Sequence, residues 1–242
     1  MTPFVETVKR SAETIAAILE KGWRREFSDY DGVGAGGDET AGIDRLAEKI
    51  YVENLGRFGK IDSEECGVVG SGETTVVLDP IDGSSNAVSG LPYFGSSIAL
   101  ERDGKVEEAV VVNLANGDFF YKTTKGLMRS KLGEERSGAV VRRESAAIGI
   151  FEKAYANPDL ALALLRRKMK FRSPGAVALS LAYAHYVDFV IFAGPRRRYD
   201  FAAALWMCEE LVTITEPELL IVAKERSTAE ALQRLAHEKE RP

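Results

Sequence analysis

The chain has 242 residues, of which 45% are hydrophobic and 29% are charged, and its formal net charge is −5. This length suffices for one large domain, or for two smaller ones that share an interface. Acidic and basic residues are interspersed, and no apolar run approaches the roughly 18 residues of a membrane span. The composition therefore argues against a nucleic-acid binder, a membrane-surface protein and a membrane-spanning protein.

The cysteines and histidines are few and form no motif. Cys66 and Cys208 lie far apart, and the first residues lack the apolar core of a signal peptide. We therefore expect reduced thiols, an inert Cys66 and a cytoplasmic location. The two histidines are too few for a His-rich zinc site. The single Gln among many Glu and Arg residues resembles the composition of thermophilic proteins.

Helical spacing of apolar residues predicts an amphipathic helix over residues 4–27. Residues 29–42 are polar and contain four glycines between positions 32 and 37. They predict a mobile loop, which is either a plain connector or an active-site lid. A second helix is expected from 43 to 51, with Asp44 near its N-terminus, where a carboxylate favours the helix dipole. A short strand at 60–67 ends at Glu64 and Glu65, a pair that alone is typical of a solvated turn.

The motif DPIDGSSN occupies residues 79–86. It follows an apolar, β-branched run at 76–78 that reads as the end of a buried strand. This strand would deliver Asp79 and Asp82 to one end of a sheet, and a proline and a glycine would bend the backbone around them. Ser84 and its neighbours offer backbone N–H groups where a helix could begin. Two interpretations remain: a cation that holds a phosphate, or an Asx turn that caps a helix.

Beyond this motif, an antiparallel meander is predicted over residues 96–121. We place a domain boundary near Gly126, between an N-terminal αβ half (1–126) and a C-terminal αβ half (127–242). In the second half, strands are expected at 146–151, 170–172, 188–192 and 219–223. Helices are expected at 159–167, 175–186, 200–211 and 227–238. The predicted fold class is α/β (mixed α+β), in two layered αβ halves.

Four groups of acidic residues along the chain, named at the end of this paragraph, need one explanation. Three of these groups fall at strand ends or helix starts, where open α/β sheets bind ligands. Two unit charges about 4 Å apart repel by roughly 4 kcal/mol at an effective dielectric constant near 20. A gathered cluster would therefore require cations. Carboxylate ligands select hard ions such as Mg²⁺, with Mn²⁺ as a substitute, and such ions promote phosphoryl transfer to water. The four groups are Asp44, Glu64 with Glu65, Asp79 with Asp82, and Asp200.

Five segments in this order resemble the metal-dependent inositol monophosphatase and fructose-1,6-bisphosphatase superfamily, including archaeal members that act on both substrates. The resemblance implies a layered αβαβα sandwich of the sugar-phosphatase type. It also implies a Mg²⁺-dependent hydrolase that cleaves a sugar or inositol phosphate by direct attack of a metal-activated water. The segments are GAGGDETAGID at 34–44, DSEECG at 62–67, DPIDGSSN at 79–86, FRSPGAVALSLAY at 171–183 and YDFAAA at 199–204.

The resemblance also implies residue roles. The implied metal ligands are Glu64, Glu65, Asp79, the carbonyl of Ile81, Asp82 and Asp200. The implied catalytic residues are Glu64, Ser84 and Asp44, with Ser84 in place of the family's threonine. The implied phosphate- and substrate-binding residues are Asp82, Gly83, Ser84, Ser85, Ser173, Gly175 and Ala176, although Pro174 is a departure from the family pattern. Asp38 and Thr40 would belong to the lid.

Basic residues near the site suggest the substrate. Arg196, Arg197 and Arg198 precede Asp200, and together with Arg172 they would suit a second phosphate, although such a run also occurs as solvated surface. This favours fructose 1,6-bisphosphate over inositol 1-phosphate, with activity on both expected. Alternatives are a non-catalytic regulatory relative that binds a phosphorylated ligand, and a nucleotide 3′-phosphatase. We also expect a homodimer with a role in gluconeogenesis, and no nucleic-acid or membrane partner.

Overall fold

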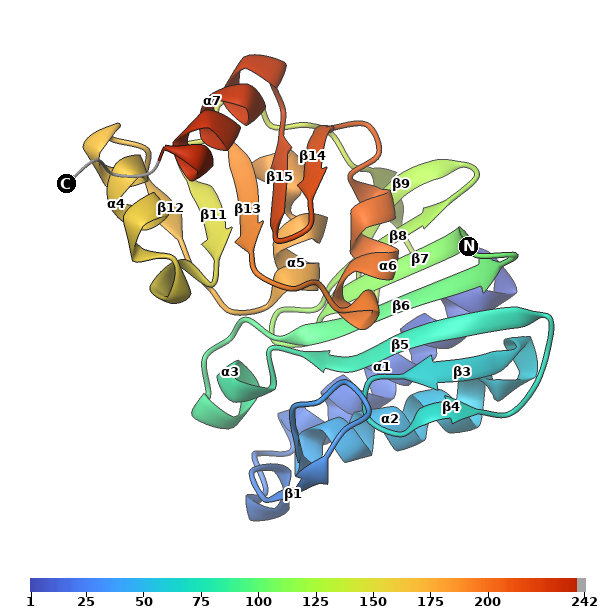
Figure 1. Cartoon of the computed structure of the whole chain (residues 1–242). Helices are drawn as coiled ribbons and strands as arrows, with labels where there is room; N and C mark the ends of the chain where they lie inside the picture. Colours follow the sequence, from blue (N-terminus) through green and yellow to red (C-terminus); the bar gives the residue numbers. More distant parts are fainter. Residues whose placement is uncertain (239–242) are drawn as a thin grey trace.

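The computed structural model describes residues 1–238 as five alternating layers of helices and sheets (Figure 1). An eight-stranded sheet has the order β10-β9-β8-β7-β6-β5-β3-β4. Its strands β3 and β5 are parallel, and the other neighbouring pairs are antiparallel. In chain order the strands are β3 (Lys60–Ser63), β4 (Gly67–Val69), β5 (Thr74–Asp82), β6 (Gly95–Arg102), β7 (Lys105–Asn113), β8 (Asp118–Thr123), β9 (Gly126–Lys131) and β10 (Ser137–Ala139).

Both faces of this sheet are covered, because alternate side chains of its central strands enter two different cores. Val76 and Leu78 pack with helices α1 (Pro3–Glu20) and α2 (Gly42–Leu55). Val77, between them, packs with helices α5 (Val177–Ala182) and α6 (Arg198–Met207). Successive side chains of a β-strand point to opposite faces of the sheet, so a strand that is buried on both faces contributes alternate residues to each core.

A second, five-stranded sheet has the order β12-β11-β13-β15-β14. One of its faces packs on the α5–α6 layer, and the other packs on helices α4 (Pro158–Arg166) and α7 (Arg226–His237). The expected αβαβα sandwich is therefore confirmed. The strands are β11 (Gly149–Glu152), β12 (Phe171–Arg172), β13 (Phe189–Ala193), β14 (Val212–Glu216) and β15 (Leu219–Ala223). Among residues 1–238, no helix is long and apolar enough to cross a membrane.

Several predicted elements have different limits. The first helix ends at Glu20 instead of continuing to residue 27, and Gly22, with a φ of +108°, is followed by the short 3₁₀ turn η1 (Arg25–Phe27). The predicted loop at 29–42 is a hairpin of strands β1 (Tyr30–Val33) and β2 (Glu39–Ala41). The helix expected at 175–186 is split into α5 and the 3₁₀ turn η4 (Ala184–Tyr186). Strand β14 was not predicted.

The expected boundary near Gly126 lies inside the large sheet, because β9 and β10 extend that sheet to Ala139. The chain passes to the second sheet between Ala139 and Gly149. The remaining short elements are η2 (Gly56–Phe58), α3 (Ser84–Ser89) and η3 (Ala154–Ala156).

Candidate metal centre and active site

Four buried acids from three elements converge at the carboxyl ends of strands β3 and β5 of the large sheet. Glu64 directly follows β3, and its N–H donates to the Leu78 carbonyl of the parallel strand β5 at 2.9 Å. Asp79 lies next to this contact, and Asp200 is in the first turn of α6. One carboxylate oxygen from each of Glu64, Asp79 and Asp200 lies within 4.8 Å of the other two. The structure thus brings acids from both halves of the chain together.

Asp82 reaches the same place through an irregularity in β5. In its pairing with β6, Asp79 lies opposite Ser97 and Asp82 lies opposite Gly95, so β5 contains one residue more than its partner. Residues three apart on a regular strand face opposite sides, and such a bulge redirects them. Both aspartates line the same cavity. The N–H of Leu179 donates to Asp82 Oδ2 at 2.9 Å and ties it to α5.

Burial and mutual repulsion make these carboxyls difficult to ionise. Glu64, Asp79, Asp82 and Asp200 are each at most 7% exposed. Burial raises the pKa of Glu64 to about 8, with further contributions from the charges of Asp200 and Glu65. Burial, followed by neighbouring acids, holds the pKa of Asp79 and Asp82 well above the usual range. A cation that supplied positive charge here would stabilise the ionised cluster.

The donor set fits a hard divalent cation. The gathered atoms are carboxylate oxygens, and the carbonyl of Ile81, which also borders the cavity, is another oxygen donor. Oxygen ligation of this kind suits Mg²⁺ or Mn²⁺ rather than zinc. Cys66 is exposed, and desolvation raises the pKa of its thiol to about 12, so it stays a neutral thiol outside this donor set.

Arg197 inserts a positive charge into the cluster. Its Nη1 lies 2.6 Å from Glu64 Oε1, and its Nε lies 3.1 Å from Asp200 Oδ2. The same Nη1 pairs with Asp38 of the β1–β2 hairpin. The guanidinium therefore binds two of the acids that are candidates to hold a metal, and it links them to the hairpin.

The β1–β2 hairpin is bonded to the Glu64–Glu65 turn. Gly36 N–H donates to the Glu64 carbonyl at 2.7 Å, and Ala35 N–H donates to the Glu65 carbonyl at 2.9 Å. The Thr40 hydroxyl donates to the half-buried Glu65 carboxylate. The hairpin borders the cavity that Asp79 and Asp82 line. It therefore lies where an active-site lid, one of the two interpretations of this segment, would lie. Thr40 does not line the cavity, and its contact with the site is this hydrogen bond to Glu65.

Ser84 and Asp44 form a second, smaller polar unit. Gly83 adopts the left-handed conformation (φ +89°) and α3 begins at Ser84, whose hydroxyl donates to Asp44 Oδ1 at 2.5 Å. Asp44 Oδ2 accepts a hydrogen bond from the Ala41 N–H at 2.7 Å, so the carboxylate caps α2. Asp44 is 1% exposed, and burial raises its pKa to about 7.

The cavity has a volume of about 590 Å³, which is within the range for a small phosphorylated metabolite. Most residues predicted for the site border it, namely Asp38, Glu64, Glu65, Asp79, Ile81, Asp82, Gly83, Ser84, Ser85, Gly175, Arg197 and Asp200. Ser173 and Ala176 are not among its lining residues. Ala176 nevertheless packs against Gly83, because a Cβ added to Gly83 would lie 3.0 Å from the Ala176 Cβ.

The structure places three of the four predicted arginines elsewhere. Arg196 donates to the carbonyls of Glu216 and Leu219, and Arg198 pairs with Asp62 and Glu101. Arg172 is exposed and donates to the carbonyl of Phe171. Backbone geometry explains the difference: the chain is extended at Arg197 and helical from Arg198 on, so neighbouring side chains diverge.

Sequence reasoning missed Glu152 and Lys153, which border the same cavity at the end of β11. Glu152 is 3% exposed and accepts hydrogen bonds from Gly175 N–H at 2.9 Å and Ser180 Oγ at 2.5 Å. Strand β11 runs parallel to β13. The rule that ligands bind at the carboxyl ends of parallel strands could therefore have found both residues.

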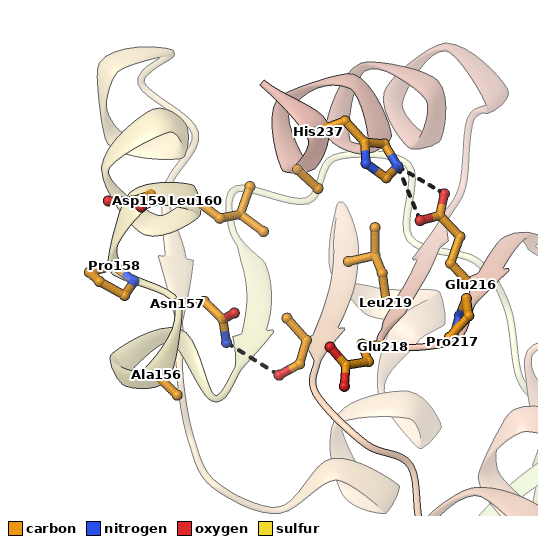
Figure 2. A pocket seen from close by; sticks show the side chains of 12 residues that line it. Ala156, Asn157, Pro158, Asp159, Leu160, Glu216, Pro217, Glu218, Leu219 and His237 are labelled. Carbon is orange, nitrogen blue, oxygen red and sulfur yellow. Dashed lines mark hydrogen bonds and ion pairs between the residues drawn. The ribbon is translucent and has the colours of Figure 1, made fainter. Parts of the chain in front are cut away.

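A second cavity, of about 650 Å³, lies on the outer side of the small sheet (Figure 2). It is bordered by η3, α4, the β14–β15 turn and α7. Its carboxylate Glu216 pairs with His237 at 3.0 Å, as the dashed lines in Figure 2 show. The cluster formed by Glu64, Asp79 and Asp200 does not border this cavity, so it is separate from the candidate active site.

Comparisons with known proteins agree with this geometry. A model of the inositol monophosphatase family matches residues 1–239. The fructose-1,6-bisphosphatase/inositol-1-monophosphatase of Archaeoglobus fulgidus is 30% identical over 217 residues, which cover 83% of this chain and 78% of that protein. The bifunctional NADP phosphatase/NAD kinase of Methanococcus maripaludis is 28% identical over 71% of this chain, which spans 36% of that longer protein.

The fold agrees as well. The crystal structure of the MJ0109 gene product, an inositol monophosphatase–fructose 1,6-bisphosphatase, superposes with a TM-score of 0.81 and 24% identity, covering 97% of this chain and all of that one. The resemblance seen in the five sequence segments is thus confirmed. The chain belongs to the inositol monophosphatase family.

Proposed function

We propose that this chain is a Mg²⁺-dependent phosphatase that hydrolyses a phosphate monoester of a sugar or an inositol. The observation that carries the proposal is the convergence of buried Glu64, Asp79 and Asp200, from both halves of the chain, beside the start of α3. Relatives at about 30% identity carry the names of fructose 1,6-bisphosphatase and inositol-1-monophosphatase, which supports both ester types as substrates.

The proposed ligands are Glu64, Asp79, Asp82, Asp200 and the carbonyl of Ile81, with Glu65 beside them. A divalent cation held by these oxygens would neutralise phosphate charge and lower the pKa of a water. The backbone N–H groups of Gly83, Ser84 and Ser85, at the start of α3, would receive the phosphate oxygens.

We assign proton handling to Ser84 and Asp44. The Ser84 hydroxyl borders the cavity and donates to a buried carboxyl with a pKa near neutrality. A group with such a pKa can exchange a proton near pH 7. The proton lost by the attacking water would pass through Ser84 Oγ to Asp44 as the new oxygen–phosphorus bond forms. The ester oxygen–phosphorus bond breaks on the opposite side, and the departing alkoxide takes a proton from a solvent water. The proton on Asp44 then returns through Ser84 Oγ to the hydroxide left by that water, which restores the carboxylate.

The direct test is phosphate release from fructose 1,6-bisphosphate and inositol 1-phosphate, with Mg²⁺, with Mn²⁺ and with a chelator. We expect release from at least one ester with either cation and none with the chelator. The Glu64→Gln and Asp82→Asn variants should stay folded and lose most of kcat. Absence of release from either ester with both cations would contradict the proposal.

The relative named NADP phosphatase favours one further candidate substrate. NADP should therefore be included in the same assay. If NADP is hydrolysed with a higher kcat/KM than both other esters, the enzyme is a nucleotide phosphatase of this family. The homodimer, the cytoplasmic location, the role in gluconeogenesis and the thermophilic origin stay predictions from the sequence.

A further inference from the structure

We infer that Lys153 is a specificity-determining residue that binds a second phosphate on the substrate. This inference rests on the proposed phosphatase function and names the preferred substrate class, a sugar bisphosphate. It replaces the role that the sequence assigned to Arg172, Arg196 and Arg198, whose side chains are engaged outside the cavity.

Lys153 occupies the place where a ligand is expected in this sheet. It follows β11, which is parallel to β13, and the register pairs Glu152 with Phe192. Lys153 therefore stands at the carboxyl end of two parallel strands, and its side chain borders the cavity together with Phe192 and Asp200.

The backbone holds Lys153 in an unusual conformation. Its φ of +59° and ψ of 31° are left-handed, which costs energy for a residue with a side chain. The conformation is fixed by its carbonyl, which accepts hydrogen bonds from Ala156 N–H at 3.0 Å and from Asn157 Nδ2 at 3.0 Å. Asn157 Nδ2 also donates to the Ala193 carbonyl at the end of β13, the bond drawn at Asn157 in Figure 2. Strained residues that are fixed in this way are concentrated at functional sites.

The side chain is packed along the cavity wall. The Lys153 Nζ lies 5.0 Å from the centre of the Phe192 ring, in cation–π contact. A Cβ added to Gly194 would lie 3.7 Å from Lys153 Cδ, so the lysine stem passes over that glycine. These contacts restrict the ammonium group to this side of the cavity.

The charge of Lys153 is available to an anion. Two cations border the cavity, and the other, Arg197, is paired with Asp38, Glu64 and Asp200. Within residues 1–238, no ion pair or side-chain hydrogen bond of Lys153 is found. Burial raises the pKa of Asp200, and the Lys153 ammonium opposes this rise only through space, less than Arg197 does. A half-buried cation without an ion-pair or hydrogen-bond partner, at the wall of a substrate cavity, suits a phosphate.

The two proposed phosphate positions border the same cavity, as one molecule with two phosphates requires. The Gly175 carbonyl lies behind Gly83 at the start of α3, where the reacting phosphate is proposed to bind. On its other side, Gly175 donates to Glu152, the residue before Lys153. One segment of chain therefore separates the two phosphate positions, and the cavity of about 590 Å³ has room for the sugar between them.

The test compares fructose 1,6-bisphosphate with fructose 1-phosphate, which lacks only the second phosphate. In Lys153→Asn, asparagine tolerates the left-handed backbone, so the fold is preserved. We expect its kcat/KM for the bisphosphate to fall about 10- to 100-fold, mainly through KM, since a charge-assisted hydrogen bond is lost. The value for fructose 1-phosphate should stay within about twofold. Lys153→Arg should retain most of the preference.

Lys168→Asn is the matched control, because Lys168 is also left-handed (φ +58°) but borders a different cavity. It should leave both values unchanged. An equal loss on both substrates in Lys153→Asn, or no loss, would overturn the inference. If the wild-type protein hydrolyses no ester at all, the proposed function fails instead. In the wild type, KM for the bisphosphate should rise with ionic strength, and this dependence should weaken in Lys153→Asn.

Discussion

The Ser84 hydroxyl connects the start of α3 to the acid that caps α2. It donates to Asp44 Oδ1, and Ser84 Oγ also lies 3.0 Å from the carbonyl oxygen of Ile81. We predict that Ser84→Ala lowers kcat by about 100-fold, the usual scale for loss of a proton-transfer group, with little change in metal affinity. Ser84→Thr, which retains the hydroxyl, should keep most of the activity. Steady-state kinetics and calorimetric titration with Mn²⁺ separate the two effects, and equal activity of the Ala and Thr variants would refute the role.

The Arg197 guanidinium lies against Glu64 and Asp200, so it would compete with a cation for their carboxylate oxygens. We predict opposite effects for Arg197→Met. Without divalent cations the melting temperature should fall by a few degrees, because repulsion among the acids is less compensated. The affinity for Mn²⁺ should rise by about tenfold, since two opposite charges no longer compete for these oxygens.

Thermal unfolding with a chelator and calorimetric titration with Mn²⁺ measure both quantities. Arg198→Met is the control, because Arg198 pairs with Asp62 and Glu101 away from the gathered acids. It should leave the Mn²⁺ affinity unchanged. If Arg197→Met weakened Mn²⁺ binding, the arginine would be a support of the site and not a competitor.

At the scale of single residues, the sequence predicted acids better than cations. Asp79 and Asp82 were predictable because a strand and a turn motif fix their location. The direction of Arg196, Arg197 and Arg198 depends on where α6 begins, and helix starts are uncertain by a few residues in such predictions. Lys153 carries no motif, and its position depends on the pairing of β11 with β13, a contact between distant segments.

At the scale of elements, the glycines of the hairpin allow it to approach the acids. A Cβ added to Gly36 would lie 2.6 Å from Glu64 Cγ, which is closer than real contacts allow. We predict that Gly36→Ala displaces Glu64 or the hairpin, and that it lowers kcat/KM and Mn²⁺ affinity at least about tenfold. The melting temperature should change little, because the hairpin is a peripheral two-stranded element.

Gly138→Ala in β10 is the matched control, since an added Cβ there meets no atom within 4 Å. It should leave activity and Mn²⁺ affinity unchanged. Unchanged kinetics of Gly36→Ala would show that the hairpin can move away from Glu64 without consequence for the site.

The same hairpin shows why some elements escaped prediction. Four glycines in six residues indicate a loop by local propensity, but hydrogen bonds to the Glu64–Glu65 turn order them. Strand β14 has alternating, β-branched residues, which are a strand signal, but it was missed because it has only five residues and no apolar run. Local sequence pattern predicted the long, strongly periodic helices and strands, whereas tertiary contacts determine where the short elements form.

At the scale of the whole molecule, the site exists because two halves of the chain meet. The α5–α6 layer packs against both sheets, and α6 carries Asp200 to the edge where β3 and β5 end. Neither half holds the complete cluster. The order of the motifs along the chain predicted this convergence. The charged residues after Gly126 gave no pattern of strands, yet they form β9 and β10 of the first sheet.

The buried acids should make the stability of the whole molecule depend on pH and, if they hold a metal as proposed, on divalent cations. Burial raises the pKa of Asp44 to about 7 and that of Glu64 to about 8, and it also holds the pKa of Asp79 and of Asp82 well above the usual range. In the unfolded chain these carboxyls ionise near pH 4. Between about pH 5 and pH 8 the folded state therefore binds more protons than the unfolded state, so stability falls as pH rises.

We predict that, in a chelator, the melting temperature decreases steadily from pH 5 to pH 8. With saturating Mg²⁺ the decrease should be much smaller, because the cation stabilises the ionised cluster. Burial lowers the pKa of His185, so this one group makes stability rise with pH and opposes the effect of the several carboxyls. The double variant Asp79→Asn/Asp82→Asn should flatten the chelator curve, since it removes two of the titrating carboxyls. A melting temperature that rises with pH in the chelator would mean that these acids are not held protonated in the folded molecule.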